Sequence, residues 1–176
     1  MKTIFLAALE DETKGLNAFI FTGVGKINAT FKTLDVINKY NPKKIVNFGT
    51  AGSTKANIQG LVRCTNFIQR DMDVRGLLNF KLGETPFDSI NKIAFGKGGL
   101  TCGTGDSFVK SKVELGCDVV DMEAYAIAKV CKIKNVEFKC YKYISDYANS
   151  NSNNDWNNNI AKGAGLFLEK FPESIL

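Results

Sequence analysis

Short apolar runs alternate with helix-like segments along this chain, and this alternation constrains the fold more than any single motif. The expected strands are Ile4–Leu9, Phe19–Phe21, Lys44–Phe48, Leu61–Gln69, Ile93–Phe95, Leu100–Cys102, Val119–Val120 and Glu137–Ile144. Helices are expected over Ile27–Asn38, from about Met122 onward, and over Ile160–Phe171. Alternating strands and helices predict a three-layer α/β domain. No repeat or linker divides the chain, so residues 1–176 are expected to form a single domain.

Charge and residue usage exclude several classes of function. The net charge is +5, but the lysines are scattered and only three arginines occur, Arg63, Arg70 and Arg75. A nucleic-acid interface would cluster such residues, so none is expected. The chain contains no histidine, which excludes a histidine base and a histidine metal ligand.

The cysteines and the hydropathy pattern indicate the compartment. The five cysteines are an odd number and include no Cys-x-x-Cys pair, so neither a disulfide framework nor a zinc site is expected. No metal is expected elsewhere. A reduced, cytoplasmic protein fits this usage. No apolar run approaches the length of a membrane span, and no signal peptide is apparent at the N-terminus.

The stretch Val119–Val130 joins a strand end to an alanine-rich helix. If the helix begins near Met122, then Glu123, Ile127 and Val130 lie on one face. A carboxylate in line with an apolar stripe needs hydrogen-bond donors if it is buried. Two interpretations stay open: Glu123 faces water at the helix start, or donors from the protein or a ligand surround it.

Polar clusters follow the strand candidates at separated places in the sequence. They contain Glu12, the Gly49–Ser53 segment, Phe108 and Asp146, and Glu123 makes a fifth. Each has an ordinary structural explanation, such as a helix cap or a tight turn. Open α/β sheets nevertheless bind ligands at the carboxyl ends of their strands, so convergence at one edge predicts a pocket.

One glycine-rich segment and one asparagine-rich segment lie outside these clusters. Thr22–Lys26 is not a dinucleotide fingerprint, because Asn28 stands at the third glycine position and no acidic residue follows about 20 residues on. No cofactor is therefore expected. Asn149–Asn159 is predicted to be a loop, or a helix start capped near Asn154 or Asp155.

Six segments, taken together, resemble the purine nucleoside phosphorylase and nucleosidase superfamily, and most closely its 5'-methylthioadenosine/S-adenosylhomocysteine nucleosidases. They occur in the family's order and span nearly the whole chain. The matching segments are Ala7–Glu12, Thr22–Ala29, Val46–Gly52, Gly105–Val109, Val120–Ala124 and Ile144–Ala148. The most specific part is Asp-Met-Glu-Ala at 121–124 followed by Ile-Ser-Asp at 144–146. The resemblance implies a three-layer sandwich around a mixed, largely parallel twisted sheet.

The resemblance also implies the chemistry of the catalytic residues. Asp146 matches the general acid that protonates or hydrogen-bonds N7 of adenine, and Ser145 would orient it. Glu12 matches the carboxylate that positions and activates the attacking water. Two carboxylates acting around an oxocarbenium-like transition state parallel the logic of glycoside hydrolysis.

The substrate-binding positions follow in the same way. Glu123 is expected to accept hydrogen bonds from the ribose hydroxyls, with Met122 against the sugar. Phe108 and Val109 are expected to stack on the base and to contact its edge. Three positions of the glycine segment complete the set: Thr50, Ala51 and Gly52.

Hydrolysis is favoured over phosphorolysis by an argument from charge. Phosphorolysis needs a phosphate held by cationic groups, usually arginine. None of the three arginines lies in a matching motif, and Asn47 occupies the position that resembles a phosphorylase arginine. Glu12 near the nucleophile would repel phosphate while suiting water. The alternatives are a purine nucleoside phosphorylase, a trimmed nucleoside-binding protein without turnover, and hydrolysis of a different purine nucleoside.

An assembly is implied by the resemblance as well. In relatives, a neighbouring subunit supplies part of the pocket for the 5' substituent, and the Asp71–Val74 loop resembles the region involved. A homodimer that acts on a small purine nucleoside in methionine salvage is therefore expected, without a nucleic-acid or membrane partner.

Overall fold

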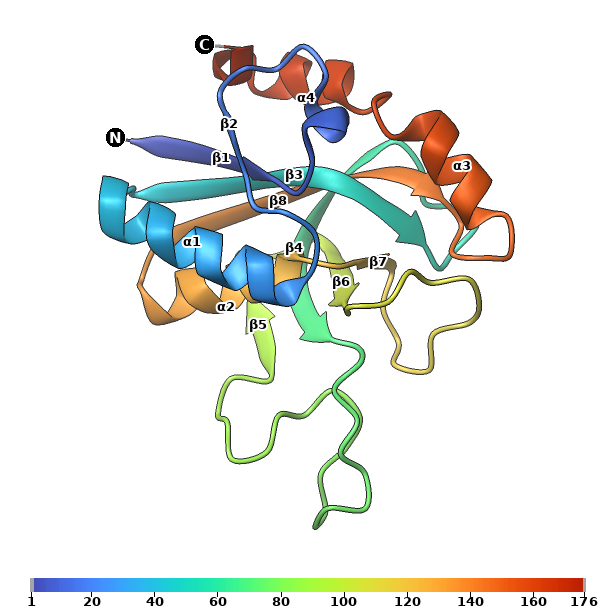
Figure 1. Cartoon of the computed structure of the whole chain (residues 1–176). Helices are drawn as coiled ribbons and strands as arrows, with labels where there is room; N and C mark the ends of the chain where they lie inside the picture. Colours follow the sequence, from blue (N-terminus) through green and yellow to red (C-terminus); the bar gives the residue numbers. More distant parts are fainter. Residues whose placement is uncertain (1, 176) are drawn as a thin grey trace.

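A computed structural model describes residues 2–175 as one mixed eight-stranded sheet with helices on both faces (Figure 1). The strands are β1 (Thr3–Ala7), β2 (Phe19–Phe21), β3 (Lys44–Ser53), β4 (Leu61–Gln69), β5 (Lys92–Ala94), β6 (Leu100–Thr104), β7 (Val119–Asp121) and β8 (Glu137–Asp146). The helices are α1 (Lys26–Tyr40), α2 (Ala124–Ile133), α3 (Ser152–Asn159) and α4 (Ala164–Lys170), with 3-10 turns η1 (Glu10–Thr13) and η2 (Pro172–Ile175).

The sheet is mixed and mostly parallel, as predicted. Five of its eight strand pairings are parallel, and the antiparallel ones are β3 with β7, β4 with β5 and β4 with β8. The strands β3, β8, β4, β6 and β7 pair in turn, and β7 pairs back to β3. This part of the sheet therefore closes into a ring, which turns the ends of β3, β7 and β8 toward one another.

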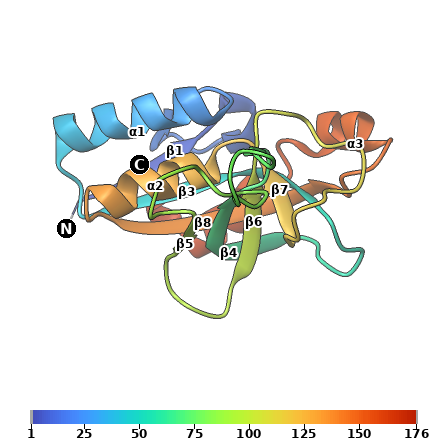
Figure 2. The same ribbon diagram turned by 90° about the horizontal axis from the view of Figure 1, so that it is seen from below.

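The alternation of side chains along the central strands explains the three layers. In β1, Ile4 and Leu6 pack with α1 and α2, while Phe5 and Ala7 pack on the opposite face with α4. Strands β3 and β8 divide their buried side chains in the same way. Because both faces are apolar, both must be covered. Figure 2 shows α1 and α2 side by side along one face.

An aromatic cluster anchors α4 to the other face. Phe167 is fully buried, and its ring centroid lies 4.5 Å from that of Phe48 and 5.6 Å from that of Phe19. Phe5 and Phe171 complete the cluster around it. This packing holds the C-terminal region of the chain against the sheet.

Two expectations for the glycine-rich and C-terminal segments were wrong. Gly49–Ser53 is not a turn after a strand, because its backbone continues β3 by pairing with β7 and β8, with a register shift between Ala51 and Gly52. Ile160–Phe171 is not one helix. A Cβ at Gly163 would lie 2.4 Å from the Cβ of Tyr143, so the chain turns closely over that side chain and α4 begins only at Ala164.

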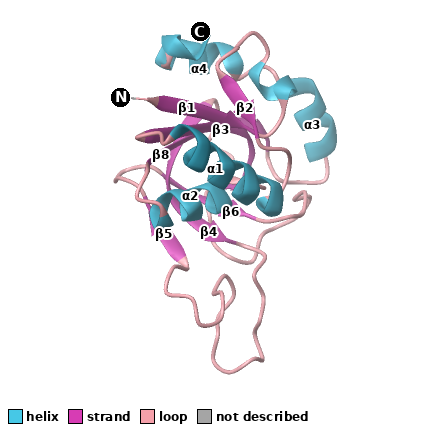
Figure 3. Cartoon of the chain, turned by 60° about the vertical axis from the view of Figure 1, so that its left-hand side comes forward, coloured by secondary structure: helices cyan, strands magenta, loops and turns pink. Residues whose placement is uncertain are grey.

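The asparagine-rich segment is also more regular than expected. It forms α3 from Ser152, with Asn151 at the N-cap position, so the cap predicted near Asn154 or Asp155 was wrong. Elsewhere, residues 70–91 between β4 and β5 extend away from the sheet as a long loop (Figure 3). None of the helices within residues 2–175 combines the length and hydropathy that crossing a bilayer requires.

Candidate active site

A cavity of about 320 Å³ opens where β1, β3, β7 and β8 reach their carboxyl ends. This volume lies in the range of small-molecule pockets. The structure brings all ten residues singled out from the sequence into its lining: Glu12, Thr50, Ala51, Gly52, Phe108, Val109, Met122, Glu123, Ser145 and Asp146.

Glu12 is buried at the start of this cavity and accepts four hydrogen bonds. Its Oε2 accepts from the backbone N–H groups of Ala8 and Leu9, each at 3.2 Å. Its Oε1 accepts from the backbone N–H of Thr50 at 2.7 Å and from the Thr50 hydroxyl at 2.8 Å. The 3-10 turn η1 returns Glu12 toward the end of β1, so this carboxylate both caps its own turn and lines the pocket. Four donors fix it in one orientation.

Asp146, the last residue of β8, lines the same cavity and is 5% exposed. The Ser145 hydroxyl donates to its Oδ2 at 2.9 Å, which is the contact expected of an orienting serine. The backbone N–H of Ala148 donates to Oδ1 at 2.9 Å. A Cβ at Gly52 would lie only 2.7 Å from that oxygen, so Asp146 rests directly against the backbone of β3.

Glu123 stands at the N-cap position of α2, is 7% exposed and points into the cavity rather than into water. The backbone N–H of Gly25 donates to its Oε1 at 3.0 Å, and Gly25 has the positive φ of 94° that glycine tolerates. Burial raises the pKa of Glu123 to about 8, and the nearby charge of Asp121 adds to this shift. Of the two interpretations left open by the sequence, the buried one is correct.

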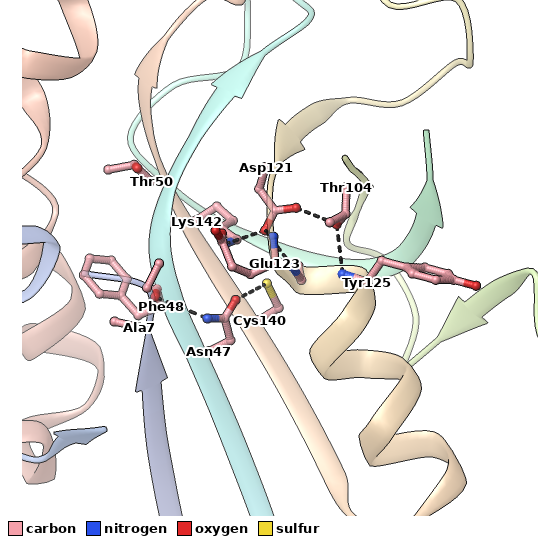
Figure 4. A network of polar contacts seen from close by, with 12 residues as sticks. Ala7, Asn47, Phe48, Thr50, Thr104, Asp121, Glu123, Tyr125, Cys140 and Lys142 are labelled. Atoms are coloured by element: carbon pink, nitrogen blue, oxygen red, sulfur yellow. Dashed lines mark hydrogen bonds and ion pairs between the residues drawn. The ribbon is translucent and has the colours of Figure 1, made fainter. Parts of the chain in front are cut away.

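A buried ion pair behind Glu123 was not foreseen from the sequence. Lys142 on β8 and Asp121 on β7 point toward one another, with Thr104 on the far side of the carboxylate (Figure 4). The backbone N–H of Ala124 also donates to Asp121 at 2.8 Å, which ties the start of α2 to the pair. Burial alone would raise the pKa of Asp121, but the Lys142 charge and these hydrogen bonds hold it below its ordinary value.

Arg70 positions the segment that carries Phe108 and Val109. Its guanidinium donates to the carbonyl oxygens of Gly105 and Ser107 and to the Ser107 hydroxyl. Phe108 is 39% exposed at the mouth of the cavity. Arg70 itself lines the cavity, although it lies in none of the six segments that carry the family resemblance.

Three further lining residues come from α3 and were missed. Asn153, Trp156 and Asn157 have the i, i+3, i+4 spacing that places residues on one helix face. That spacing is the signal in the sequence that indicates a common helix face for the three residues. The indole Nε1 of Trp156 donates to the Thr50 hydroxyl at 3.0 Å, so α3 is bound to the cavity wall.

The side chains of residues 2–175 include no group of three or more His, Cys, Asp or Glu residues that could hold a metal ion. The polar groups that line the cavity are carboxylates, hydroxyls, amides, one indole and the guanidinium of Arg70. Such a set can transfer protons and bind polar hydroxyl and ring-nitrogen groups.

Comparisons with known proteins find relatives by sequence and solved structures with the same fold. No protein-family model matches the chain. A Bacillus cereus (strain G9842) protein named 5'-methylthioadenosine/S-adenosylhomocysteine nucleosidase is 30% identical over 80% of this chain and 74% of its own length. A Helicobacter pylori MTAN mutant, solved with 5'-methylthioadenosine in its active site, covers 98% of both chains with a TM-score of 0.86 at 21% identity. Native futalosine hydrolase of Helicobacter pylori covers 99% of this chain and 97% of its own, with a TM-score of 0.87 at 21% identity. At 21% identity the two structures show a shared fold.

Proposed function

This chain belongs to the family of 5'-methylthioadenosine/S-adenosylhomocysteine nucleosidases, and from that membership we propose how its cavity works. The protein is an N-glycosidase that hydrolyses the N-glycosidic bond of a purine nucleoside. The proposed substrates are 5'-methylthioadenosine, S-adenosylhomocysteine and 5'-deoxyadenosine, with adenine as the released base. The observation that carries the assignment of roles is that Glu12 and Asp146, far apart in sequence, line one cavity.

In the proposed mechanism, Asp146 acts on the base and Glu12 acts on water. The bond between C1' of the sugar and N9 of adenine breaks, and its electron pair goes to the base. Asp146 donates a proton or a hydrogen bond to N7, which stabilises the departing adenine. The water oxygen bonds to C1', and Glu12 accepts the proton that the water loses. Positive charge on the sugar is stabilised by the surrounding carboxylates.

The remaining lining residues are proposed to hold the substrate. Glu123 binds the ribose hydroxyls through the oxygen that Gly25 does not occupy, and Met122 lies against the sugar. Phe108 and Val109 contact the base, with Ser145 orienting Asp146 beside it. The β3 backbone at Thr50, Ala51 and Gly52 forms the wall between the two carboxylates.

Water is favoured over phosphate as the nucleophile by the placement of the cations. Asn47, at the position that resembles a phosphorylase arginine, is 1% exposed and donates to the carbonyl oxygens of Leu6 and Phe48. Arg70 is committed to the 105–107 segment. Lys142 is neutralised by Asp121. A phosphate in the cavity would thus lie beside carboxylates, with no free guanidinium among the described lining residues to bind it.

The function is tested by incubating the protein with 5'-methylthioadenosine in phosphate-free buffer and separating the products chromatographically. Adenine and a free 5'-methylthio sugar are expected in equal amounts. A requirement for phosphate, with a sugar 1-phosphate as product, would favour a phosphorylase. Binding without product on prolonged incubation would favour a nucleoside-binding protein. Futalosine, assayed in parallel, tests hydrolysis of a different nucleoside, because the fold also matches a futalosine hydrolase.

We further propose that the protein acts as a homodimer. Val24, Ile27 and Phe31 form an apolar strip that begins at the cavity and runs along α1, and they are 41%, 82% and 71% exposed. Asp71 lies beside this strip, because its carboxylate accepts a hydrogen bond from Lys26 at 2.6 Å. A second copy would cover the strip and complete the pocket for the 5' substituent. Light scattering of the wild type and of Phe31→Glu tests this proposal, since the variant should be monomeric.

The proposed location is the cytoplasm and the proposed role is methionine salvage. All five cysteines are free, and four of them are buried, as suits a reducing compartment. Loss of 5'-methylthioadenosine turnover in cells lacking the protein would support the role, and an unchanged level of that nucleoside would argue against it.

A further inference from the structure

Helix α3 is polar along most of its length, and within residues 2–175 two side-chain hydrogen bonds join it to the sheet. Its sequence, from Ser152 to Asn159, contains a single aromatic residue, and only Ser152 is buried. The helix therefore gains little from apolar burial. Trp156 and Asn159 supply the two bonds, and each one ends next to a different carboxylate of the cavity.

The first bond controls the hydroxyl that holds Glu12. The indole N–H of Trp156 donates to the Thr50 Oγ1 at 3.0 Å, and Thr50 Oγ1 donates to Glu12 Oε1 at 2.8 Å. An indole N–H is a donor only, and a hydroxyl has a single proton. Since Thr50 accepts from Trp156, its proton is free to point at Glu12. Trp156 thereby fixes the direction of one of the four bonds that orient this carboxylate.

The second bond controls the backbone that carries Asp146. Asn159 Nδ2 donates to the carbonyl oxygen of Ser145 at 2.8 Å, and this carbonyl belongs to the peptide group whose nitrogen is that of Asp146. Lys162 donates to Asn159 Oδ1 at 2.7 Å, which determines which end of the amide faces Ser145. The Ser145 hydroxyl then bonds Asp146 Oδ2 at 2.9 Å.

We propose that Trp156 and Asn159 are positioning residues through which α3 clamps Glu12 and Asp146 at a fixed separation for catalysis. The inference rests on the proposed function, since it concerns the two carboxylates assigned to water and to the base. Because α3 bonds both Thr50 and the Ser145 carbonyl, it keeps Glu12 and Asp146 at a constant distance. The attacking water and the departing base then stay on opposite sides of the C1'–N9 bond. Misplacement of a reacting group by about 1 Å can cost on the order of a hundredfold in rate.

The test compares kcat and KM for adenine release among single variants of α3. Trp156→Phe removes the donor and keeps an aromatic ring, while Asn159→Ala removes the amide. Each should lower kcat about tenfold, as expected for one lost hydrogen bond, and change KM less than twofold. Asn158→Ala is the matched control, because Asn158 is exposed and makes no side-chain hydrogen bond to any part of residues 2–175. It should behave as the wild type.

A second comparison separates positioning from a general loss of structure. Thr50→Val should lower kcat as much as Trp156→Phe, and the double variant should lose little more, because both act on one bond to Glu12. Thermal unfolding should place the α3 variants within about 2 °C of the wild type. Adenine should quench the fluorescence of Trp156, the single tryptophan, with the same affinity in Asn159→Ala as in the wild type.

The inference is overturned if Trp156→Phe and Asn159→Ala keep the wild-type kcat, if the whole loss lies in KM, or if Asn158→Ala loses as much. Additive losses in the double variant would contradict the shared bond to Glu12. A wild-type protein that releases no adenine would overturn the proposed function, and this inference with it. The two failures are thus distinguished by the activity of the unmodified chain.

Discussion

Lys142 Nζ lies 2.8 Å from Asp121 Oδ2, and both side chains are 1% exposed. The pair links β7 to β8 directly behind the residues proposed to bind the sugar (Figure 4). Burial alone would lower the pKa of Lys142, but the negative charge of Asp121 raises it well above its ordinary value. Both groups therefore stay charged at neutral pH, and each is the main electrostatic partner of the other.

Lys142→Met should destabilise the fold strongly. The substitution keeps a similar volume but leaves Asp121 buried without its cation, a situation that typically costs about 3–5 kcal/mol. Lys139→Met on the same strand is the control, because Lys139 is 33% exposed and its pair with Glu137 spans 3.6 Å. That change should cost less than about 1 kcal/mol. Urea unfolding measures the free energy of unfolding of both variants. Equal losses would show that burial of the Asp121–Lys142 pair does not determine the cost of removing the lysine.

Glu123→Gln should change the pH dependence of stability. The folded pKa of Glu123 is raised from its ordinary value of 4.5 to about 8, so the native state prefers the protonated form. The contribution of Glu123 to the free energy of unfolding is therefore complete below pH 4.5 and is lost as the pH rises through 8. Glutamine cannot ionise and mimics the protonated form. The variant should therefore match the wild type near pH 4 and have a Tm higher by several degrees at pH 9.

Glu123→Gln should lower activity at the high pH at which it raises stability. An ionised Glu123 accepts two hydrogen bonds from ribose hydroxyls, whereas an amide both donates and accepts. We expect kcat/KM of the wild type to contain a limb with an apparent pKa near 8 that Glu123→Gln lacks. An unchanged Tm difference between pH 4 and pH 9 would contradict the raised pKa, and an unchanged kcat/KM profile would contradict the role in sugar binding.

Asp146→Asn and Glu12→Gln should each lower kcat by about a hundredfold to ten-thousandfold, the usual contribution of a general acid or base. Glu12→Gln should also destabilise the protein by about 1–3 kcal/mol, because the new amide nitrogen would meet donors at every position now facing the carboxylate. Glu10→Gln in the same 3-10 turn is exposed and serves as the control for both measurements. Adenine binding should survive in all three variants. A variant of Glu12 or Asp146 with near wild-type kcat would remove that residue from the mechanism.

The eight strands, in their order along the chain, and the convergence of the polar clusters could be predicted from the sequence. The predicted strand Leu61–Gln69 has the bounds of the observed strand β4, in which Cys64, Thr65 and Phe67 are buried and Arg63 is exposed. Glu123 follows β7, which runs antiparallel to β3, but Glu12 follows β1 and Asp146 ends β8, and parallel pairing of these two strands with β3 brings their carboxyl ends to one edge. This geometry is a property of the fold class, so it can be inferred before any contact is known.

The residues that were missed depend on partners distant in sequence. Lys142 occurs in a strand where a lysine is expected to reach solvent, and only Asp121 on a neighbouring strand makes its burial tolerable. Trp156 stands in an asparagine-rich helix without apolar periodicity, so its contact with Thr50 is purely tertiary. The break at Gly163 in the predicted C-terminal helix also depends on a distant residue. Tyr143 occupies the space that a Cβ at position 163 would need.

Gly52→Ala should impair catalysis through Asp146. An added methyl group would lie 2.7 Å from Asp146 Oδ1 and 3.2 Å from Cγ2 of Val120, so the carboxylate must move. Because Ser145 and Ala148 hold both carboxylate oxygens, it cannot move without loosening at least one of these bonds. We expect kcat to fall about tenfold to a hundredfold, with a smaller change in KM. Gly116→Ala is the control, since a Cβ there would meet no atom within 4 Å and its φ is not positive. If both variants retained the wild-type kcat and Tm, the close approach of Asp146 to the β3 backbone would have no part in placing the acid.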